Sequence, residues 1–134
     1  MTPVPTEIAA VFDAAPEAVR ARLYGLRAMA FAAAEATGTL PLEESLKWGQ
    51  PAFRPKAPRT GTTLRLGWRA EACTLFVPCQ TDLLDQYRAR FAGLFAFDGD
   101  RAVHVPVAPG PDEAALQQMM AMALTYHRDK RGRA

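Results

Sequence analysis

The sequence predicts an α+β fold, in which one antiparallel sheet of about five strands carries helices on one face. Helical periodicity is confined to the two ends of the chain and one inner segment, whereas strand-like segments follow one another between them. The 134 residues contain no internal repeat and no linker, which favours a single domain. Hydrophobic residues make up 49% and charged residues 22% of the chain, proportions typical of a soluble folded domain.

The chain is expected to begin with a loose segment, residues 1–4, followed by two helices. Thr6 is a suitable cap for a short helix over residues 7–12. Asp13 is the expected cap of a second, long helix, which should end at Gly38 because glycine tolerates the left-handed conformation. The apolar stripe of the long helix is Val19, Leu23, Leu26, Ala30 and Ala33, and the arginines predicted to lie mostly off it are Arg20, Arg22 and Arg27.

Strand-like segments fill the middle of the chain. Residues 43–48 predict a short strand that ends at a turn over residues 49–51, and alternation places Leu46 and Trp48 on its buried face. After a proline-rich loop, residues 63–69 alternate between an apolar and a polar face, as a half-buried antiparallel strand does. The apolar face carries Leu64, Leu66 and Trp68, and the polar face carries Arg65, Gly67 and Arg69.

Residues 73–78 are apolar on both faces, which predicts a central strand. Cys73 and Cys79 are expected to be buried free thiols, since a bridge between them would need a tight reversal inside this strand. A third helix should open at residues 81–82 and stop at Gly93. Its apolar side carries Leu83, Leu84, Tyr87 and Phe91.

An Asp-Gly pair at residues 98–99 predicts a hairpin between residues 95–97 and 102–107, because this pair suits a tight turn. A last helix is predicted from Asp112, and His127 is expected to pack on its apolar side. An exposed apolar side on this helix would instead indicate a homodimer contact. The apolar side carries Leu116, Met119, Met120, Ala123, Leu124 and His127.

Residues 44–53 read ESLKWGQPAF: a strand ends in a tryptophan, turns at glycine and proline, and resumes with an aromatic residue. This segment resembles the signature of the YdhG-like family, domain of unknown function 1801, and the order of elements is similar over most of the chain. The resemblance implies a YdhG-like fold for residues 1–134. At least one member is regarded as an iron chaperone, so the resemblance also implies iron as an alternative ligand. Asp82 and Asp85, which share one side of the third helix, are the candidate iron ligands.

Positive charge is concentrated in the C-terminal tail, residues 128–134. Without the four basic residues of this tail, the net charge of +2 would become about −2, so a nucleic-acid binder is not expected. The tail is expected to be a solvated, frayed end, with contact to phosphate as the alternative. Neither a secretory signal nor an apolar segment of membrane-spanning length is visible, so we expect a cytoplasmic protein without a membrane segment.

Recognisable catalytic motifs are absent from the sequence. It contains no phosphate-binding glycine loop, no dinucleotide fingerprint and no paired-cysteine zinc motif. The one serine, Ser45, is not flanked by glycine as a nucleophile elbow requires. The favoured interpretation is therefore a non-enzymatic binding domain without a cofactor, and an enzyme built from ordinary residues is the alternative.

The candidate ligand-binding residues lie on and beside the predicted sheet. Trp48 either stacks on a planar ligand or packs in the core. Gln50 either presents its amide to a ligand or bonds to the neighbouring loop. A concave pocket that gathers several of the candidates would decide between these readings. The full set of candidates is Lys47, Trp48, Gln50, Arg65, Trp68, Arg69 and His104.

A small basic patch is predicted on the open face of the sheet. Lys47, Arg65 and Arg69 would converge there if their strands are neighbours, and such a patch suits a carboxylate or a phosphate. His104 is placed to share this face, where its protonation would tune anion binding. A solvated face with loose ion pairs is the alternative. The sequence thus favours a binding module for a small anion or a protein partner, with iron handling as the alternative function.

Overall fold

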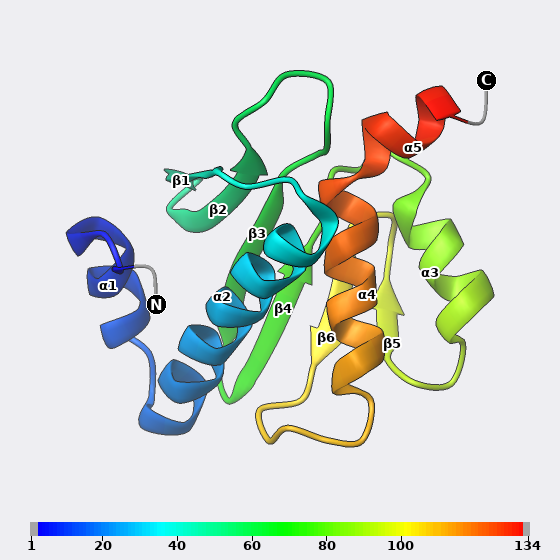
Figure 1. Ribbon diagram of the computed structural model, residues 1–134. Coiled ribbons are helices and arrows are strands. Elements are labelled where there is room, and N and C mark those ends of the chain that lie inside the picture. The colour runs from blue at the N-terminus through cyan, green and yellow to red at the C-terminus, as the bar shows by residue number, and fades with distance from the viewer. Residues whose placement is uncertain (1–2, 133–134) are drawn as a thin grey trace.

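Six antiparallel strands form one sheet in the order β1-β2-β3-β4-β6-β5 (Figure 1). The structure is a computed structural model and describes residues 3–132. The predicted α+β fold is confirmed, with six strands where about five were expected. The strands are β1 (Leu42–Lys47), β2 (Gln50–Pro55), β3 (Leu64–Arg69), β4 (Ala72–Phe76), β5 (Ala96–Asp98) and β6 (Ala102–Val105). The helices are α1 (Thr6–Asp13), α2 (Glu17–Thr37), α3 (Leu83–Phe91), α4 (Glu113–Leu124) and α5 (Tyr126–Gly132).

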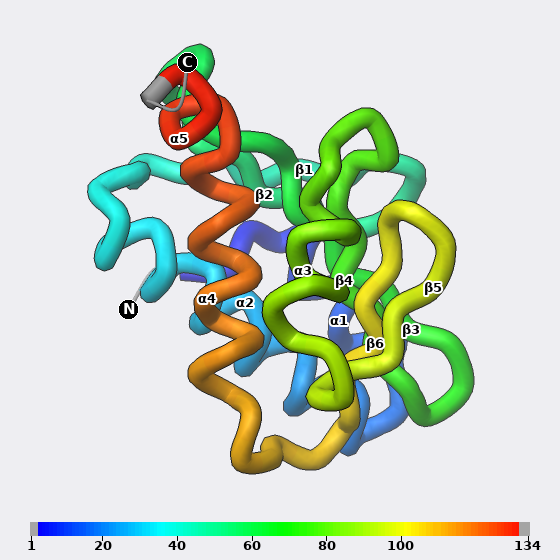
Figure 2. The backbone as a smooth tube through the Cα atoms, turned by 90° about the vertical axis from the view of Figure 1, so that its right-hand side faces the viewer, coloured from blue at the N-terminus to red at the C-terminus, as the bar shows by residue number. Residues whose placement is uncertain are grey.

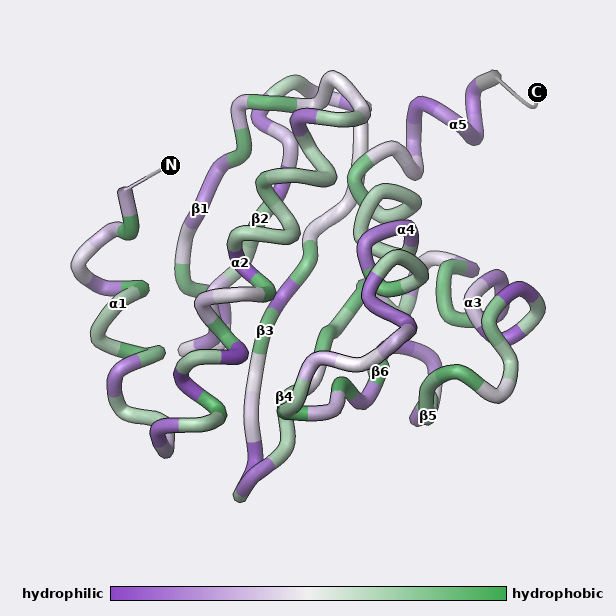
Figure 3. Tube along the Cα trace, turned by 60° about the horizontal axis from the view of Figure 1, so that its bottom comes forward, coloured by the Kyte–Doolittle hydropathy of each residue, from purple (hydrophilic) through white to green (hydrophobic). Residues whose placement is uncertain are grey.

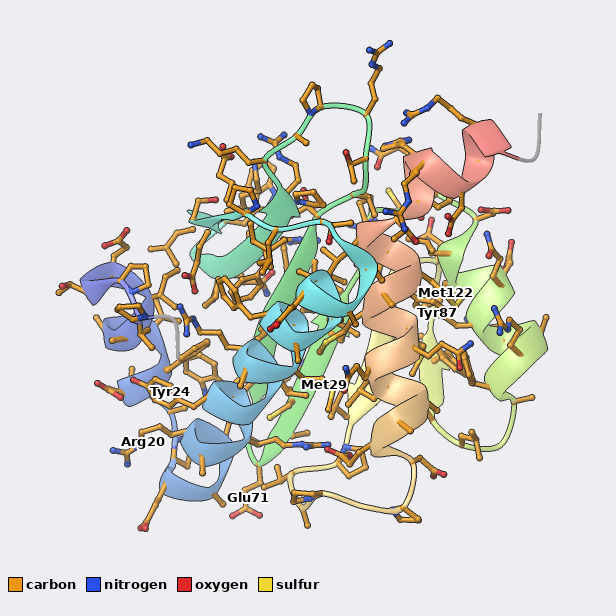
Figure 4. All side chains as sticks on the ribbon, in the orientation of Figure 1. Arg20, Tyr24, Met29, Glu71, Tyr87 and Met122 are labelled. Carbon is orange, nitrogen blue, oxygen red and sulfur yellow. The ribbon has the colours of Figure 1, made fainter. Side chains whose placement is uncertain are left out.

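Helices α2 and α4 lie side by side on one face of the sheet, and α3 packs beside α4 (Figures 1 and 2). Hydrophobic segments concentrate where these helices meet the strands, whereas α5 is almost uniformly hydrophilic (Figure 3). Tyr87 points from α3 toward α4, where its buried hydroxyl donates to the carbonyl oxygen of Met119 at 2.6 Å (Figure 4). The predicted apolar sides of α2, α3 and α4 are confirmed as core, with the exception of His127. Their buried members include Val19, Leu23, Leu26, Leu84, Phe91, Leu116, Met120 and Leu124.

Strand β2 is the element that the sequence did not predict. Its two prolines indicated a turn and a loop, because proline cannot donate to a ladder. In the β1–β2 register, Pro51 and Pro55 face Leu46 and Leu42. In an antiparallel pair of strands, hydrogen-bonded and non-hydrogen-bonded residue pairs alternate, starting here with the hydrogen-bonded pair Lys47–Gln50 beside the turn. Both prolines therefore fall in non-hydrogen-bonded pairs, and their nitrogens point away from β1. Pairing between β2 and β3 covers only residues 52–53 of β2, so no ladder hydrogen bond is lost there either.

The prediction that Leu46 and Trp48 are both buried is wrong. Strand β1 ends at Lys47, and Trp48 is the first residue of the turn, so strand alternation does not extend to its side chain. Trp48 is 90% exposed. Leu46 lies near the end of the edge strand β1 and is 39% exposed. Trp68, in contrast, is half-buried and packs against the core as predicted.

The predicted helix starts are shifted. Thr6 is the first residue of α1 and makes no capping hydrogen bond, and Pro5 occupies the cap position. Asp13 ends α1 instead of capping α2, and its carboxylate accepts a hydrogen bond from the Tyr24 hydroxyl at 2.8 Å, which ties α2 to α1 (Figure 4). Helix α2 ends as predicted at Gly38, with a φ of 69°.

The first residues of the chain, 1–4, were expected to be loose. Of these, Val4 packs against the core, and the carbonyl oxygen of Pro3 accepts a hydrogen bond from Arg27 at 2.9 Å. Residues 3 and 4 are therefore held by the fold, whereas the part of the expectation that concerns residues 1–2 lies outside the described residues.

Two arginines predicted to lie off the apolar stripe of α2 are buried. Arg22 binds both carboxylate oxygens of Glu113 at 2.5 and 2.8 Å and donates to the carbonyl of Pro106. Arg27 binds both carboxylate oxygens of Glu44 at 2.6 and 2.9 Å. Bidentate pairs of this kind supply hydrogen-bond acceptors to a buried guanidinium. An arginine can therefore be buried at positions that helical periodicity assigns to the surface.

The last predicted helix is divided in two at Thr125. The Thr125 hydroxyl oxygen lies 2.9 Å from the Ala121 carbonyl oxygen and 2.7 Å from the Asp129 carboxylate, and its one hydrogen is shared between these two acceptors. Helix α5 then starts in a new direction (Figure 1). His127 is consequently exposed, and the prediction that it packs in the core is wrong. Residues 128–132 of the tail are helical and not frayed, and residues 133–134 lie outside the described part of the chain.

The remaining predicted elements match the structure within a few residues. The β5–β6 hairpin forms, with Asp98 paired to Ala102 and a three-residue connection between them. Both cysteines are free thiols, but only Cys73 is buried, and Cys79 is half-buried after the end of β4. Among residues 3–132, none of the helices is both long and apolar enough to cross a bilayer.

Candidate anion-binding groove

A groove of about 450 Å³ gathers three cationic side chains and the indole of Trp48. Its size falls within the roughly 300–1,000 Å³ typical of small-molecule sites. Neither aspartate nor glutamate occurs among the lining residues, so the groove is positively charged. The lining consists of Lys47, Trp48, Thr63, Arg65, Pro78, Cys79, Gln80 and Arg101.

Arg65 is the central cation of the groove. It projects from the polar face of β3, where its Nη1 donates to the Gln50 side-chain oxygen at 2.9 Å and its guanidinium lies 5.2 Å from the centre of the Phe76 ring. Burial, and secondly the charge of Arg101, lower the pKa of Arg65 from its ordinary value. An arginine still remains a cation at neutral pH. Within residues 3–132, no carboxylate forms an ion pair with Arg65, so its charge is not neutralised by an acidic side chain there.

The β1–β2 turn places Trp48 at the rim of the groove. Lys47 pairs with Gln50, so the connection has only two residues, and both adopt positive φ angles of 55° at Trp48 and 75° at Gly49. A two-residue hairpin of this kind favours asparagine, aspartate or glycine at its first position. A tryptophan there carries backbone strain of about 1 kcal/mol. It also exposes a large apolar ring, because the indole is 90% accessible.

Lys47 and Arg101 complete the charge of the groove. Lys47 ends β1 with an exposed side chain beside the turn. Arg101 lies in the β5–β6 connection, whose backbone is fixed by a 2.8 Å hydrogen bond from the Val77 amide to the Arg101 carbonyl. The Arg101 guanidinium lies 3.5 Å from the neighbouring Asp100 carboxylate, and both side chains are more than half exposed. That pair is weak in water, so Arg101 can turn to a ligand at little cost.

Only part of the predicted candidate set comes together. Lys47, Trp48 and Arg65 line the groove, and Gln50 lies behind it, where its amide oxygen orients the Arg65 guanidinium. The side chain of Gln50 also fills the space that a Cβ at Gly67 would need. Of the two readings proposed for Gln50, the structure shows an intramolecular hydrogen bond, in which the Gln50 side-chain oxygen accepts from Arg65 on the neighbouring strand instead of bonding to the loop.

Three predicted candidates lie elsewhere. Trp68 packs on the helix-covered side of β3, and Arg69 is exposed at the end of β3, away from the groove. His104 is exposed on the open face, as predicted, but its neighbours across the sheet are Thr74 and Ala96. Its Nε2 lies 3.7 Å from the Asp98 carboxylate. These three residues do not contribute to the groove around Arg65.

Sequence reasoning missed five of the eight lining residues: Thr63, Pro78, Cys79, Gln80 and Arg101. All five lie just before or after strands or in connections, where alternation gives no information. One signal for Arg101 was present in the sequence. Arg101 closely follows the Asp-Gly pair of the predicted hairpin, and pairing of this hairpin with the central strand would bring Arg101 near the end of that strand. The register confirms this arrangement, with Phe76 opposite Ala102.

The alternative iron ligands do not gather a coordination sphere. Asp82 precedes α3 and accepts a hydrogen bond from the Gln86 amide at 2.8 Å, and the Asp85 carboxylate lies 3.8 Å from Arg88. Across residues 3–132, the structure contains no group of three or more His, Cys, Asp or Glu side chains placed to hold a metal ion. Iron binding requires several oxygen ligands, so the geometry around α3 does not favour it.

Comparisons of the chain with protein-family models, with curated proteins and with solved structures found no match in any of the three. Three cations without a lining carboxylate can bind a carboxylate or phosphate group, and an exposed indole beside them can stack on a planar group.

Proposed function

We propose that this chain is a binding domain for a small organic anion with a planar part. Arg65, Lys47 and Arg101 bind the carboxylate or phosphate, and Trp48 stacks on the planar group. The volume of the groove suits a ligand of one or two rings. The proposal requires no chemical step.

The observation that carries the proposal is the conformation of Trp48. A tryptophan in a left-handed turn position, almost fully exposed, weakens the fold in two ways at once. The adjacent Arg65 is partly desolvated and has no carboxylate partner within residues 3–132. An anionic ring seated between these two side chains would shield the indole and neutralise the guanidinium together.

Fluorescence of Trp48 provides the test. The chain has two tryptophans, so Trp68→Phe leaves Trp48 as the only indole. Titration with benzoate should shift and quench this emission, whereas cyclohexanecarboxylate, which has the charge without the flat ring, should bind more weakly. Calorimetry on the unmodified chain should give the same order of affinity. Arg65→Ala should weaken benzoate binding about tenfold, the effect of losing one charged hydrogen-bonding partner.

Arg69→Ala is the matched control, since Arg69 lies on the same strand outside the groove. The proposal fails if benzoate leaves Trp48 emission unchanged at millimolar concentration, or if Arg65→Ala and Arg69→Ala have equal effects. A protein partner is the competing reading of an exposed tryptophan. It would be favoured if scattering showed a doubled mass that Trp48→Ala abolished while benzoate had no effect.

A further inference from the structure

We infer that the chain has a second anion site, independent of the Arg65 groove, which binds an organic molecule carrying two or more adjacent phosphate groups. The site is a pocket of about 810 Å³ between the β2–β3 connection, residues 56–63, and helix α5. Figures 1 and 2 both show this connection beside α5. The lining consists of Arg54, Pro55, Lys56, Ala57, Pro58, Arg59, Gly61, Thr62, Thr63, His127, Lys130 and Arg131.

The walls of this pocket are tied together by backbone hydrogen bonds. The Thr62 amide donates to the Ala123 carbonyl at 2.9 Å, and the Arg128 amide donates to the Thr60 carbonyl at 3.0 Å. A Cβ at Gly61 would overlap the backbone of Leu124, so glycine permits this close approach. The connection and α5 therefore hold a fixed spacing, and the pocket is formed before any ligand binds.

The pocket concentrates positive charge from both walls. Arg54, Lys56 and Arg59 come from the strand and connection, and Lys130 and Arg131 come from α5; the lining includes no acidic residue. Arg54 is neutralised by Glu43 at 2.9 Å. The other four cations form no ion pair with a carboxylate within residues 3–132, although Arg131 donates to the Arg59 carbonyl and Lys130 lies over the Tyr126 ring.

Because cations that lack a carboxylate partner within residues 3–132 lie on two facing walls, we expect a ligand that carries more than one negative charge. A diphosphate or triphosphate spreads its charge over several oxygens and so can contact more of these cations at once than a single carboxylate can. The apolar part of the lining, with Pro55 and Pro58, can contact an uncharged moiety next to the phosphates. The lining contains no Phe, Tyr or Trp, the platforms on which single-stranded nucleic acids stack, so a small phosphate ester fits better than a polynucleotide.

This site does not depend on the groove around Arg65. The two share Thr63 in their linings and no charged residue. Failure of one proposal can therefore be distinguished from failure of the other with single-site variants.

Calorimetry with ATP, pyrophosphate and adenosine, without divalent cations and at low salt, tests the inference. ATP should bind with affinity that falls steeply as salt rises, pyrophosphate should bind more weakly, and adenosine should not bind. Lys56→Ala and Lys130→Ala, one from each wall, should each weaken ATP binding about tenfold. Both side chains are exposed, so neither substitution should disturb folding, which the unfolding temperature will verify.

Arg69→Ala serves as the control and should leave ATP affinity unchanged. ATP is also an anion with a planar group, so Lys56→Ala and Lys130→Ala are measured again in combination with Arg65→Ala, which weakens binding at the Arg65 groove, and each should still weaken ATP binding about tenfold. The inference is overturned if ATP does not bind, if Arg65→Ala removes ATP binding while Lys56→Ala and Lys130→Ala do not, or if a thymidine oligonucleotide binds and ATP does not. Equal affinities for pyrophosphate and ATP would overturn the assignment of an organic moiety to the apolar wall.

Discussion

Replacing Trp48 with asparagine should stabilise the fold and abolish ligand binding at the Arg65 groove. Asparagine populates the left-handed region more readily than tryptophan, and Asn-Gly is a favoured sequence for a two-residue hairpin turn. The φ of 55° at position 48 and the glycine at position 49 already fit such a turn. The substitution thus relieves strain without moving the backbone.

The expected gain follows from two opposing effects. Relief of the strained conformation contributes about 1 kcal/mol of stability. The loss of burial is small, because 90% of the tryptophan is exposed in the native state. The remaining tenth of a large side chain is roughly 20 Å² and is worth about 0.5 kcal/mol. We therefore expect a net stabilisation of about 0.5 kcal/mol, which corresponds to roughly 2 °C in Tm.

Urea unfolding of Trp48→Asn, Trp48→Ala and the unmodified chain measures this difference, with far-ultraviolet circular dichroism as the probe. Trp48→Ala is the matched control, because alanine keeps the positive φ unfavourable and also loses the indole. It should not be stabilised. A loss of more than about 1 kcal/mol in Trp48→Asn would show that the indole packs against the protein and would remove the main support for the binding proposal.

Three further perturbations follow from contacts in the core and at the helix ends. Gly61→Ala should cost about 2 kcal/mol in urea unfolding, because the new methyl group overlaps the Leu124 backbone. Tyr87→Phe should cost about 1 kcal/mol in the same assay, since the hydroxyl donates a buried 2.6 Å hydrogen bond to α4; an unchanged midpoint would contradict this. The hydrogen bonds from Arg22, opposed in part by desolvation, hold the pKa of Glu113 below its ordinary value. The ion pair between Arg22 and Glu113 therefore stabilises the fold at pH values above the pKa of Glu113 in the unfolded chain, about 4.3. This stabilisation is lost as the pH falls through the lower pKa that Glu113 has in the folded chain. Thermal unfolding between pH 6 and pH 2 should show a steeper acid loss in the unmodified chain than in Glu113→Gln, and parallel curves would refute the assignment.

Fold class and core could be predicted from the sequence because they depend on periodicity. The stripe of α2 that begins at Val19, and the alternation of β3 around Leu66, are repeated signals that a single residue cannot reverse. Strand β2 could not be predicted, because Pro51 and Pro55 indicate a loop unless the register that places them outside the ladders is known. Register is a tertiary property, and a turn that started one residue later would place both prolines in hydrogen-bonded pairs.

The candidate site was predicted in part for the same reason. Arg65 lies on the regular polar face of a strand, so alternation located it. Trp48 was placed on the buried face because alternation was extended one residue beyond the strand, into a turn where it does not apply. Arg101 and the pocket lined by Lys130 depend on connections that meet only after the chain has folded. For Arg101 the Asp-Gly hairpin gave a signal that depends on strand pairing, whereas local sequence contains no signal for the pocket lined by Lys130.

The two buried guanidinium pairs of α2 determine how this helix is seated. Arg22 and Arg27 are five residues apart, so they project about 140° from each other around the helix and reach Glu113 on one flank and Glu44 on the other. Between them the buried side chains of Leu23 and Leu26 pack in the core, so a roll of the helix or a shift by one turn would disturb this packing as well as the two ion pairs. Such a movement would strand both guanidinium groups away from water without partners. We therefore expect the pairs Arg22–Glu113 and Arg27–Glu44 to fix the rotation and the position of α2 on the sheet.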